Sequence, residues 1–240
     1  MLILRLIMSI ILLIIYIACI IITPKQHIYI VTQYFTKVLL YICKLSKINV
    51  YNKHIFDHHC NNLNKPFIIV ANHRSLWDGI ILNSVFGKLR YLAAKGADKV
   101  FIGCKYFLRK IDCITVKEIG TVKTIQENIK NRKVTDSILV IFPDSMDPIP
   151  FGKNIAPFKT GAFATGFDIL PVVIKYKNHT INPTFYWYKN ENPFHAWIKI
   201  MLNDNINISI KVLPLIKSSS DIINMKDTVY NSMSECLKTL

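Results

Sequence analysis

The feature that most constrains this chain is an uncharged apolar run, Leu6–Ile22, close to its N-terminus. Its seventeen residues are at the lower limit for a helix that crosses a bilayer, which needs about 17–25 apolar residues. A cleaved signal peptide has a similar pattern, with Arg5 ahead of the run. However, the run is long for a signal, and Ala18–Pro24 (ACIIITP) contains no convincing small-x-small cleavage site. We therefore favour an uncleaved membrane helix.

A second apolar segment, Ile28–Leu45, is interrupted by Gln33, Lys37 and Lys44. Its tyrosines and lysines suit a helix at the membrane interface, or the second arm of a helical hairpin. An amphipathic helix packed on a globular domain would show the same pattern, and the sequence leaves these readings open. Residues 1–53 are together predicted to anchor the chain to a membrane.

The net charge is +15 and the isoelectric point about 9.5, so an anionic partner is expected. The first acidic residue is Asp57, whereas lysines follow the apolar run: Lys25, Lys37, Lys44, Lys47 and Lys53. Basic flanks favour the cytoplasmic side of a membrane and attract acidic headgroups. The sequence has no RNP motif, zinc finger or arginine-rich strip, so we expect no nucleic-acid partner.

Residues 54–65 are polar and are predicted to link the anchor to a globular domain. His54, His58, His59 and Cys60 have side chains that can bind metals, but no second ligand pair is evident, and we predict no metal site. The six cysteines include no C-x-x-C pair, which is typical of reduced thiols.

Residues 66–240 are predicted to form an α/β domain with a mostly buried central sheet flanked by helices. Apolar runs such as FIIVA and SILVIF are typical of strands covered on both faces. The predicted strands are Phe67–Ala71, Leu89–Ala94, Cys113–Val116, Ile138–Phe142, Leu170–Tyr176 and Ile208–Leu213. Helices are predicted over Ile80–Phe86 and Val122–Arg132, and after the capping candidates Ser218–Asp221.

His73 and Asp78 follow directly after the first of these strands, where α/β sheets usually carry their active sites. They can meet if His73 lies in the turn and Asp78 in the first helical turn. The same stretch, Ser75 to Asp78, also has the spacing of a capping box, in which Asp78 would be only a cap. From the residues alone, the two interpretations remain open.

Asn72-His73-x-x-x-x-Asp78 resembles the N-H-x-x-x-x-D signature of the glycerolipid acyltransferases, which include 1-acylglycerol-3-phosphate and lysophospholipid acyltransferases. Further blocks in the same order are similar to that family's: Arg90–Lys95, Ile111–Lys117, Ile141–Asp147, Pro157–Phe163 and Leu170–Tyr176. The resemblance covers roughly residues 66–215. Lys117 stands where the family usually has arginine, and Ser145, Met146 and Asp147 replace its Gly, Thr and Arg.

The resemblance implies acyl transfer from acyl-CoA, as co-substrate, to a hydroxyl of lysophosphatidate or a related lysophospholipid, with no other cofactor. It implies that His73 is the general base and that Asp78 orients it. Substrate-binding residues are expected at Lys95, Lys117, Asp144, Ser145, Met146, Asp147, Lys153 and Lys159. The lysophosphatidylcholine branch also lacks the arginine of the third block, so a remodelling acyltransferase is an alternative, as is a non-catalytic lipid-binding protein.

Overall fold

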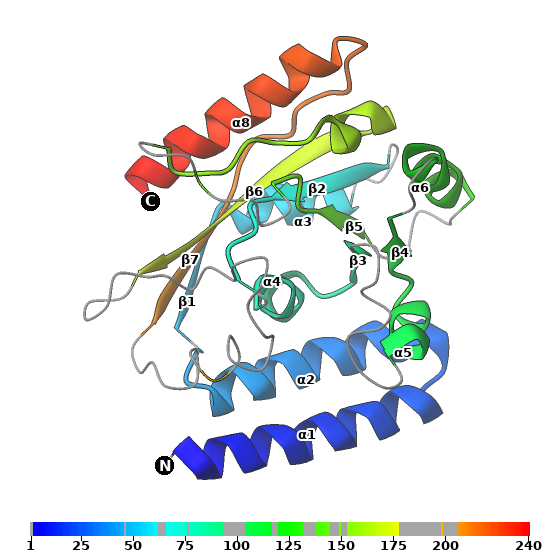
Figure 1. Ribbon diagram of the computed structural model, residues 1–240, viewed down its shortest axis with the longest axis vertical. Coiled ribbons are helices and arrows are strands. Elements are labelled where there is room, and N and C mark those ends of the chain that lie inside the picture. Colours follow the sequence, from blue (N-terminus) through cyan, green and yellow to red (C-terminus); the bar gives the residue numbers. More distant parts are fainter. Residues whose placement is uncertain are drawn as a thin grey trace.

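The computed structural model shows a central β-sheet with helices on both faces (Figure 1). It describes residues 2–45, 47–61, 66–75, 77–93, 104–116, 120–131, 138–144, 149, 153–177, 198 and 206–240. The α/β layout predicted from the sequence is confirmed.

The strands of the described residues form one seven-stranded sheet in the order β1-β7-β6-β2-β5-β3-β4. All neighbours pair in parallel except β6 and β7, which are antiparallel. The strands are β1 (Ile48–Tyr51), β2 (Phe67–Ala71), β3 (Leu89–Ala93), β4 (Ile114–Thr115), β5 (Ile138–Ile141), β6 (Asp168–Lys177) and β7 (Asn207–Val212).

The sheet is buried on both faces, which is why its central strands are continuously apolar. Side chains of β2 alternate between two hydrophobic clusters: Ile69 and Ala71 point to one face, and Ile68 and Val70 to the other. The first face is covered by α4 (Asp78–Phe86) and α2 (Ile28–Ile42). The opposite face is covered by α6 (Thr121–Lys130), the 3₁₀ helix η3 (Thr160–Thr165) and α8 (Ile222–Thr239).

Helix α1 (Leu2–Ile22) and α2 form an antiparallel hairpin, joined by the short η1 (Lys25–His27) (Figure 1). Tyr16 ties the two helices together: its hydroxyl lies 2.9 Å from Thr32 Oγ1, and its ring stacks on Phe35 with centroids 3.8 Å apart. Helix α2 in turn packs on α4. The second apolar segment is therefore both a hairpin arm and a helix packed on the domain.

The outer side of the hairpin is apolar and exposed. Large hydrophobic side chains face solvent along α1, with Ile3 72% and Ile14 62% exposed, and Tyr34 and Tyr41 do so on α2. By length and composition, Ile3–Ile22 could cross a membrane, although a signal sequence passes the same test. In the described structure, α1 lies along α2 and not away from the domain.

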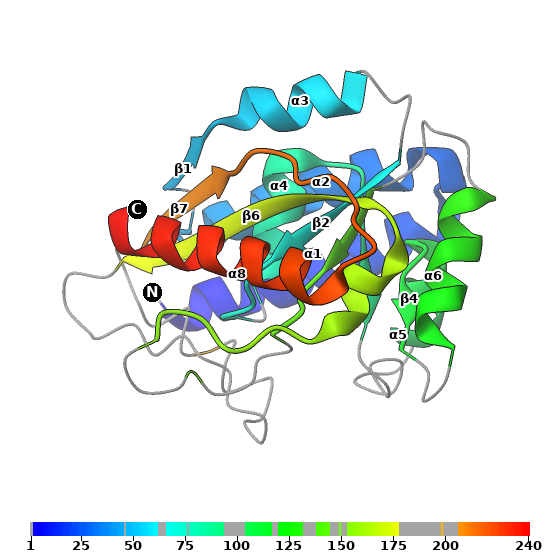
Figure 2. The same ribbon diagram turned by 90° about the horizontal axis from the view of Figure 1, so that it is seen from above.

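The residues predicted as a linker, 54–65, are helical at their start, because α3 covers Lys53–Asn61. Before them, Ile48–Tyr51 forms the edge strand β1, so the sheet begins upstream of Pro66. Helix α3 was not predicted because its sequence is mostly polar. Its buried side chain, Phe56, packs against the hydrophobic core. Figure 2 shows α3 on the outside of the sheet, beside β1 and β7.

The predicted C-terminal helix is confirmed as α8. Its N-cap is Asp221, whose side chain accepts a hydrogen bond from Asn224 N at 2.9 Å. Met225, Val229 and Met233 form its buried stripe against η3 and the sheet. Helix α5 (Cys104–Lys110), which was not predicted, lies near the end of α1.

Candidate active site

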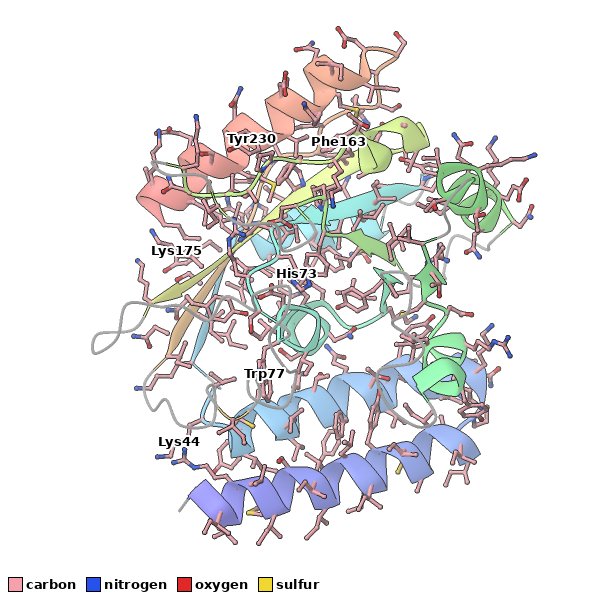
Figure 3. The ribbon with its side chains drawn as sticks, viewed as in Figure 1. Lys44, His73, Trp77, Phe163, Lys175 and Tyr230 are labelled. Carbon is pink, nitrogen blue, oxygen red and sulfur yellow. The ribbon has the colours of Figure 1, made fainter. Side chains whose placement is uncertain are left out.

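His73 lies in the loop after β2, in the middle of the sheet, and Asp78 is the first residue of α4. The neighbouring strand β5 runs parallel to β2, so both strands end at the same edge. Beyond β2 the chain continues to α4 on one face, and beyond β5 it continues to η3 on the other face. Such a switch point is where open α/β sheets usually bind their ligands. Figure 3 shows His73 there, with Trp77 toward α2, and Phe163 and Tyr230 on the α8 side.

The two side chains of the predicted pair are in contact. His73 Nδ1 lies 2.8 Å from Asp78 Oδ2. Asp78 is completely buried, whereas the His73 side chain is 19% exposed. The buried carboxylate favours the tautomer in which Nδ1 carries the proton, which leaves Nε2 as the acceptor. No described residue hydrogen-bonds Nε2, so it is available to a bound hydroxyl.

Asp78 also does what the capping interpretation predicted. Its Oδ2 accepts hydrogen bonds from Arg74 N at 2.5 Å and from Ser75 N at 2.8 Å. The reach back to Ser75 N is one half of a capping box. The other half is altered, because Ser75 Oγ accepts from Trp77 N at 3.2 Å instead of from Asp78 N. The cap and the contact with His73 therefore coexist, because one oxygen atom makes both.

The second oxygen of Asp78 accepts a hydrogen bond from the Tyr176 hydroxyl, on β6. Burial raises the pKa of Tyr176 well above its usual value, and the Asp78 carboxylate raises it further. The phenol therefore stays protonated and acts as a donor. Tyr176 belongs to a block that resembles the acyltransferases, but the sequence alone assigned it no role.

Asp144, in the loop after β5, contacts the backbone of the His73 loop. The His73 backbone N–H is directed at both of its carboxylate oxygens, with N–O distances of 3.0 and 3.1 Å. Arg74 Nη1 is 3.4 Å from Asp144 Oδ2. Burial raises the pKa of Asp144 to about 6, although Arg74 and the His73 N–H act to lower it.

Asp144 is fully buried, and its described contacts are with the His73 loop, so it helps to position that loop. The reason for these contacts lies in the strand register. Val70 pairs with Ile141, so the residues three further along each strand, His73 and Asp144, come side by side.

Phe142 stacks on the His73 ring, with centroids 4.2 Å apart and planes 17° apart. The Tyr91 ring is nearly parallel to that of Phe142, with centroids 6.1 Å apart. This stack limits rotation of the imidazole about its Cβ–Cγ bond and leaves the Nδ1 contact with Asp78 in place. No role for Phe142 was predicted from the sequence.

Two of the predicted substrate-binding lysines are described, and both are exposed in the segment between β5 and η3. Lys153 precedes Asn154, whose carbonyl lies 3.5 Å from Arg74 Nη2. Lys159 donates its backbone N–H to Pro143 O at 2.9 Å. The segment that carries them thus borders the His73 loop. The other predictions, Lys95, Lys117, Ser145, Met146 and Asp147, lie outside the described residues.

Within the described ranges, no three His, Cys, Asp or Glu side chains come together in a way that could hold a metal ion. His58 and His59 of α3 stack edge to face, with ring centroids 5.4 Å apart.

Comparison with solved structures supports the fold. The chain is similar to the crystal structure of the 1-acyl-sn-glycerophosphate acyltransferase PlsC from Thermotoga maritima, with a TM-score of 0.64 and 17% identity. The match covers 99% of this chain and 97% of that one.

Two curated proteins are similar in sequence. The 1-acyl-sn-glycerol-3-phosphate acyltransferase of Saccharomyces cerevisiae is 27% identical over 137 residues, covering 52% of this chain and 44% of that protein. The lysophospholipid acyltransferase LPCAT4 of Xenopus tropicalis is 25% identical over 158 residues, covering 62% of this chain and 29% of that protein. The chain spans less than half the length of each of these relatives.

Residues 47–175, more than half of the chain, match the model of the family described as Acyltransferase. That range holds β1 to most of β6 and includes His73, Asp78 and Asp144. On this match, the chain belongs to the Acyltransferase family.

Proposed function

We propose that this protein is an acyl-CoA-dependent O-acyltransferase that acylates the free hydroxyl of lysophosphatidate or a related lysophospholipid. The observation that carries the proposal is the contact between His73 Nδ1 and the buried Asp78, with the His73 side chain partly exposed. Membership of the Acyltransferase family and the names of the two curated relatives support the same reaction class.

In this mechanism His73 Nε2 accepts the proton of the acceptor hydroxyl as its oxygen attacks the thioester carbonyl carbon. The C–O ester bond forms, and the C–S bond breaks. The departing thiolate of CoA takes the proton back from the imidazolium. Asp78 stabilises the positive charge that His73 carries between the two proton transfers. No acyl-enzyme is needed, because the thioester is already an activated acyl donor.

The apolar outer side of the α1–α2 hairpin supports a location at a membrane, where the acceptor lipid resides. Its exposed isoleucines and tyrosines match the side chains that enter the acyl and interfacial layers of a bilayer. We propose that the hairpin holds the catalytic domain on the membrane surface, on the cytoplasmic side favoured by the flanking lysines. Lys153 and Lys159 are proposed to attract the phosphates of CoA or of the acceptor.

A second acceptor class is supported by the likeness to LPCAT4, so the assay must compare headgroups. Membranes with wild-type protein or the His73→Ala variant are given labelled oleoyl-CoA. Lysophosphatidate, lysophosphatidylcholine, lysophosphatidylethanolamine and glycerol-3-phosphate are offered separately. A product that depends on His73, formed from one of them, supports the proposal and names the acceptor. Folded wild-type protein that forms no such product from any of the four would instead favour a non-catalytic lipid-binding protein.

A further inference from the structure

The Asp78 carboxylate is fully buried and is held by hydrogen-bond donors on both of its oxygens. Oδ2 is fixed by the backbone N–H groups of Arg74 and Ser75 and also contacts His73. Oδ1 accepts from the Tyr176 hydroxyl. The two backbone N–H groups and the Tyr176 hydroxyl therefore act on different oxygens of the same carboxylate.

The Tyr176 hydrogen bond affects how the negative charge of Asp78 is divided between its two carboxylate oxygens. A donor on Oδ1 draws negative charge toward that oxygen and away from Oδ2, the atom that faces the imidazole. The fewer donors a buried carboxylate has, the more strongly it attracts a proton on the neighbouring ring.

We propose that Tyr176 is a positioning residue that acts through Asp78 and sets the pH at which His73 becomes available as a base. This inference rests on the proposed function, because it assumes that His73 and Asp78 form the catalytic pair. It goes beyond the proposed function by assigning a third residue to the control of that pair. Tyr176 lies on β6, 98 residues from Asp78 in the sequence.

Several other polar groups face the pair, and they are the same in the wild type and in the variants at position 176. Arg74 and Asp144 lie beside His73, on its own loop and on the β5 loop respectively. Burial, and to a smaller extent the charges of Cys113 and Asp78, raise the pKa of Tyr91 on β3. The Tyr91 hydroxyl donates to Gly79 O at 2.7 Å and not to Asp78. Ser75 hydrogen-bonds the Tyr176 side chain and completes the group. Among these side-chain hydroxyls, the one that donates to the carboxylate itself is that of Tyr176.

The first variant is Tyr176→Phe, which removes the hydroxyl and leaves the ring. The acid limb of the pH–rate profile should move to higher pH by on the order of half a unit. The rate on the high-pH plateau should remain within about tenfold of the wild-type rate, because His73 and Asp78 are both retained. Tyr230→Phe is the matched control, because it removes a tyrosine hydroxyl that donates to a backbone carbonyl, Ile155 O, and not to Asp78. Its acid limb should remain at the wild-type pH.

A second variant changes the donor without removing it. Placing 3-fluorotyrosine at position 176 makes the phenol more acidic and a stronger donor, with almost no change in size. More charge is then drawn from Oδ2, so the acid limb should move to lower pH. Opposite shifts from Phe and 3-fluorotyrosine are expected only if the hydrogen bond acts through the carboxylate. This variant also guards against the case in which Tyr176→Phe fails to fold.

A readout that does not need turnover is the rate at which diethyl pyrocarbonate modifies His73 as pH is varied, followed by mass spectrometry of the His73 peptide. Its midpoint should move in the same directions as the acid limb. If no acyl transfer is found but these midpoints still shift, the proposed function fails and the role of Tyr176 stands. If the enzyme is active and the Tyr176→Phe midpoint is unchanged or lower, the role of Tyr176 is refuted and the proposed function stands.

Discussion

The side chain of Asn72 forms two hydrogen bonds with one backbone unit of β6, that of Ile174. Its Nδ2 donates to Ile174 O at 2.9 Å, and its Oδ1 accepts from Ile174 N at 2.8 Å. The amide thus continues the β2–β6 ladder one step beyond the last paired residue, Ala71. Because Asn72 is fully buried, this pair fixes the direction in which the chain leaves the sheet immediately before His73.

Replacing Asn72 with Ala should therefore affect both stability and activity. The change leaves the buried N–H and C=O of Ile174 without these partners, at a cost of roughly 2–5 kcal/mol of unfolding free energy. Release of the His73 loop should also lower the rate of acyl transfer far more than it changes acyl-CoA binding. Thermal unfolding in detergent and steady-state kinetics measure the two effects. Asn224→Ala, on the exposed side of α8, is the control and should change stability by less than about 0.5 kcal/mol.

The contact between His73 and Asp78 could be predicted from the sequence, because both residues lie within one short strand–turn–helix segment. The roles of Asp144 and Tyr176 could not. Asp144 is 71 residues from His73 and Tyr176 is 98 residues from Asp78. Their contacts depend on β5 and β6 flanking β2 and on the register between these strands, which an apolar run does not specify. The motif match assigned Asp144 to substrate binding and did not predict its contact with the His73 loop.

The central strands could also be predicted, since strands covered on both faces need continuous apolar runs. The edges of the sheet could not. β1 has only four residues, Ile48–Tyr51, and its side chains alternate between half-buried and exposed, so nothing distinguishes it from a loop until β7 pairs with it. Helix α3 was hidden in the same way, because its histidines made a helical segment resemble a linker.

The exposed side of α1 should hold the protein on membranes. Ile7, Ile11 and Ile14 lie on one side of the helix and are 49%, 51% and 62% exposed. Changing all three to Ser removes apolar surface worth about 1.5–3 kcal/mol for each side chain that the bilayer buries. We therefore expect at least a hundredfold loss in partitioning to vesicles of phosphatidylcholine and phosphatidylglycerol, measured by flotation.

The matched control is Ile223→Ser. Ile223 is 54% exposed on α8, at the opposite end of the molecule from the hairpin (Figure 1). This variant should float with the vesicles as the wild type does. If the triple α1 variant floats equally well, the hairpin is not the membrane contact.

Asp112 should fasten the turn of the hairpin to the α/β domain. Its carboxylate accepts from the Tyr29 hydroxyl at 3.2 Å and lies 2.7 Å from Lys25 Nζ. Asp112→Asn keeps a side chain that tolerates the positive φ of 57° at this position and removes the charge. We expect a loss of roughly 1 kcal/mol of unfolding free energy at low salt. The difference should shrink at about 1 M NaCl, where the ion pair is screened.

Asp57→Asn provides the comparison for Asp112. Asp57 also pairs with a lysine, Lys53, at 2.6 Å, but both side chains are about half exposed. Its removal should change stability little at any salt concentration. A loss at Asp112 that does not depend on salt would mean that its ion pair with Lys25 contributes nothing measurable.

Asp144 should make the stability of the fold depend on pH in a particular direction. Its pKa of about 6 in the folded state lies above the ordinary value of 3.8, so the folded protein binds this proton more tightly than the unfolded chain. The resulting stabilisation is complete below pH 3.8 and is lost as pH rises through 6. The linkage amounts to on the order of 3 kcal/mol.

Asp144→Asn removes this titration while keeping an oxygen that can accept from His73 N. The difference in unfolding free energy, variant minus wild type, should therefore rise between about pH 4 and 6.5 and then level off. Other titrating groups are common to both proteins and cancel in this difference. Unfolding by chemical denaturant in detergent, repeated at half-unit pH steps, measures it. Curves that remain parallel across this range would show that Arg74 and the His73 N–H hold the carboxylate ionised in spite of its burial.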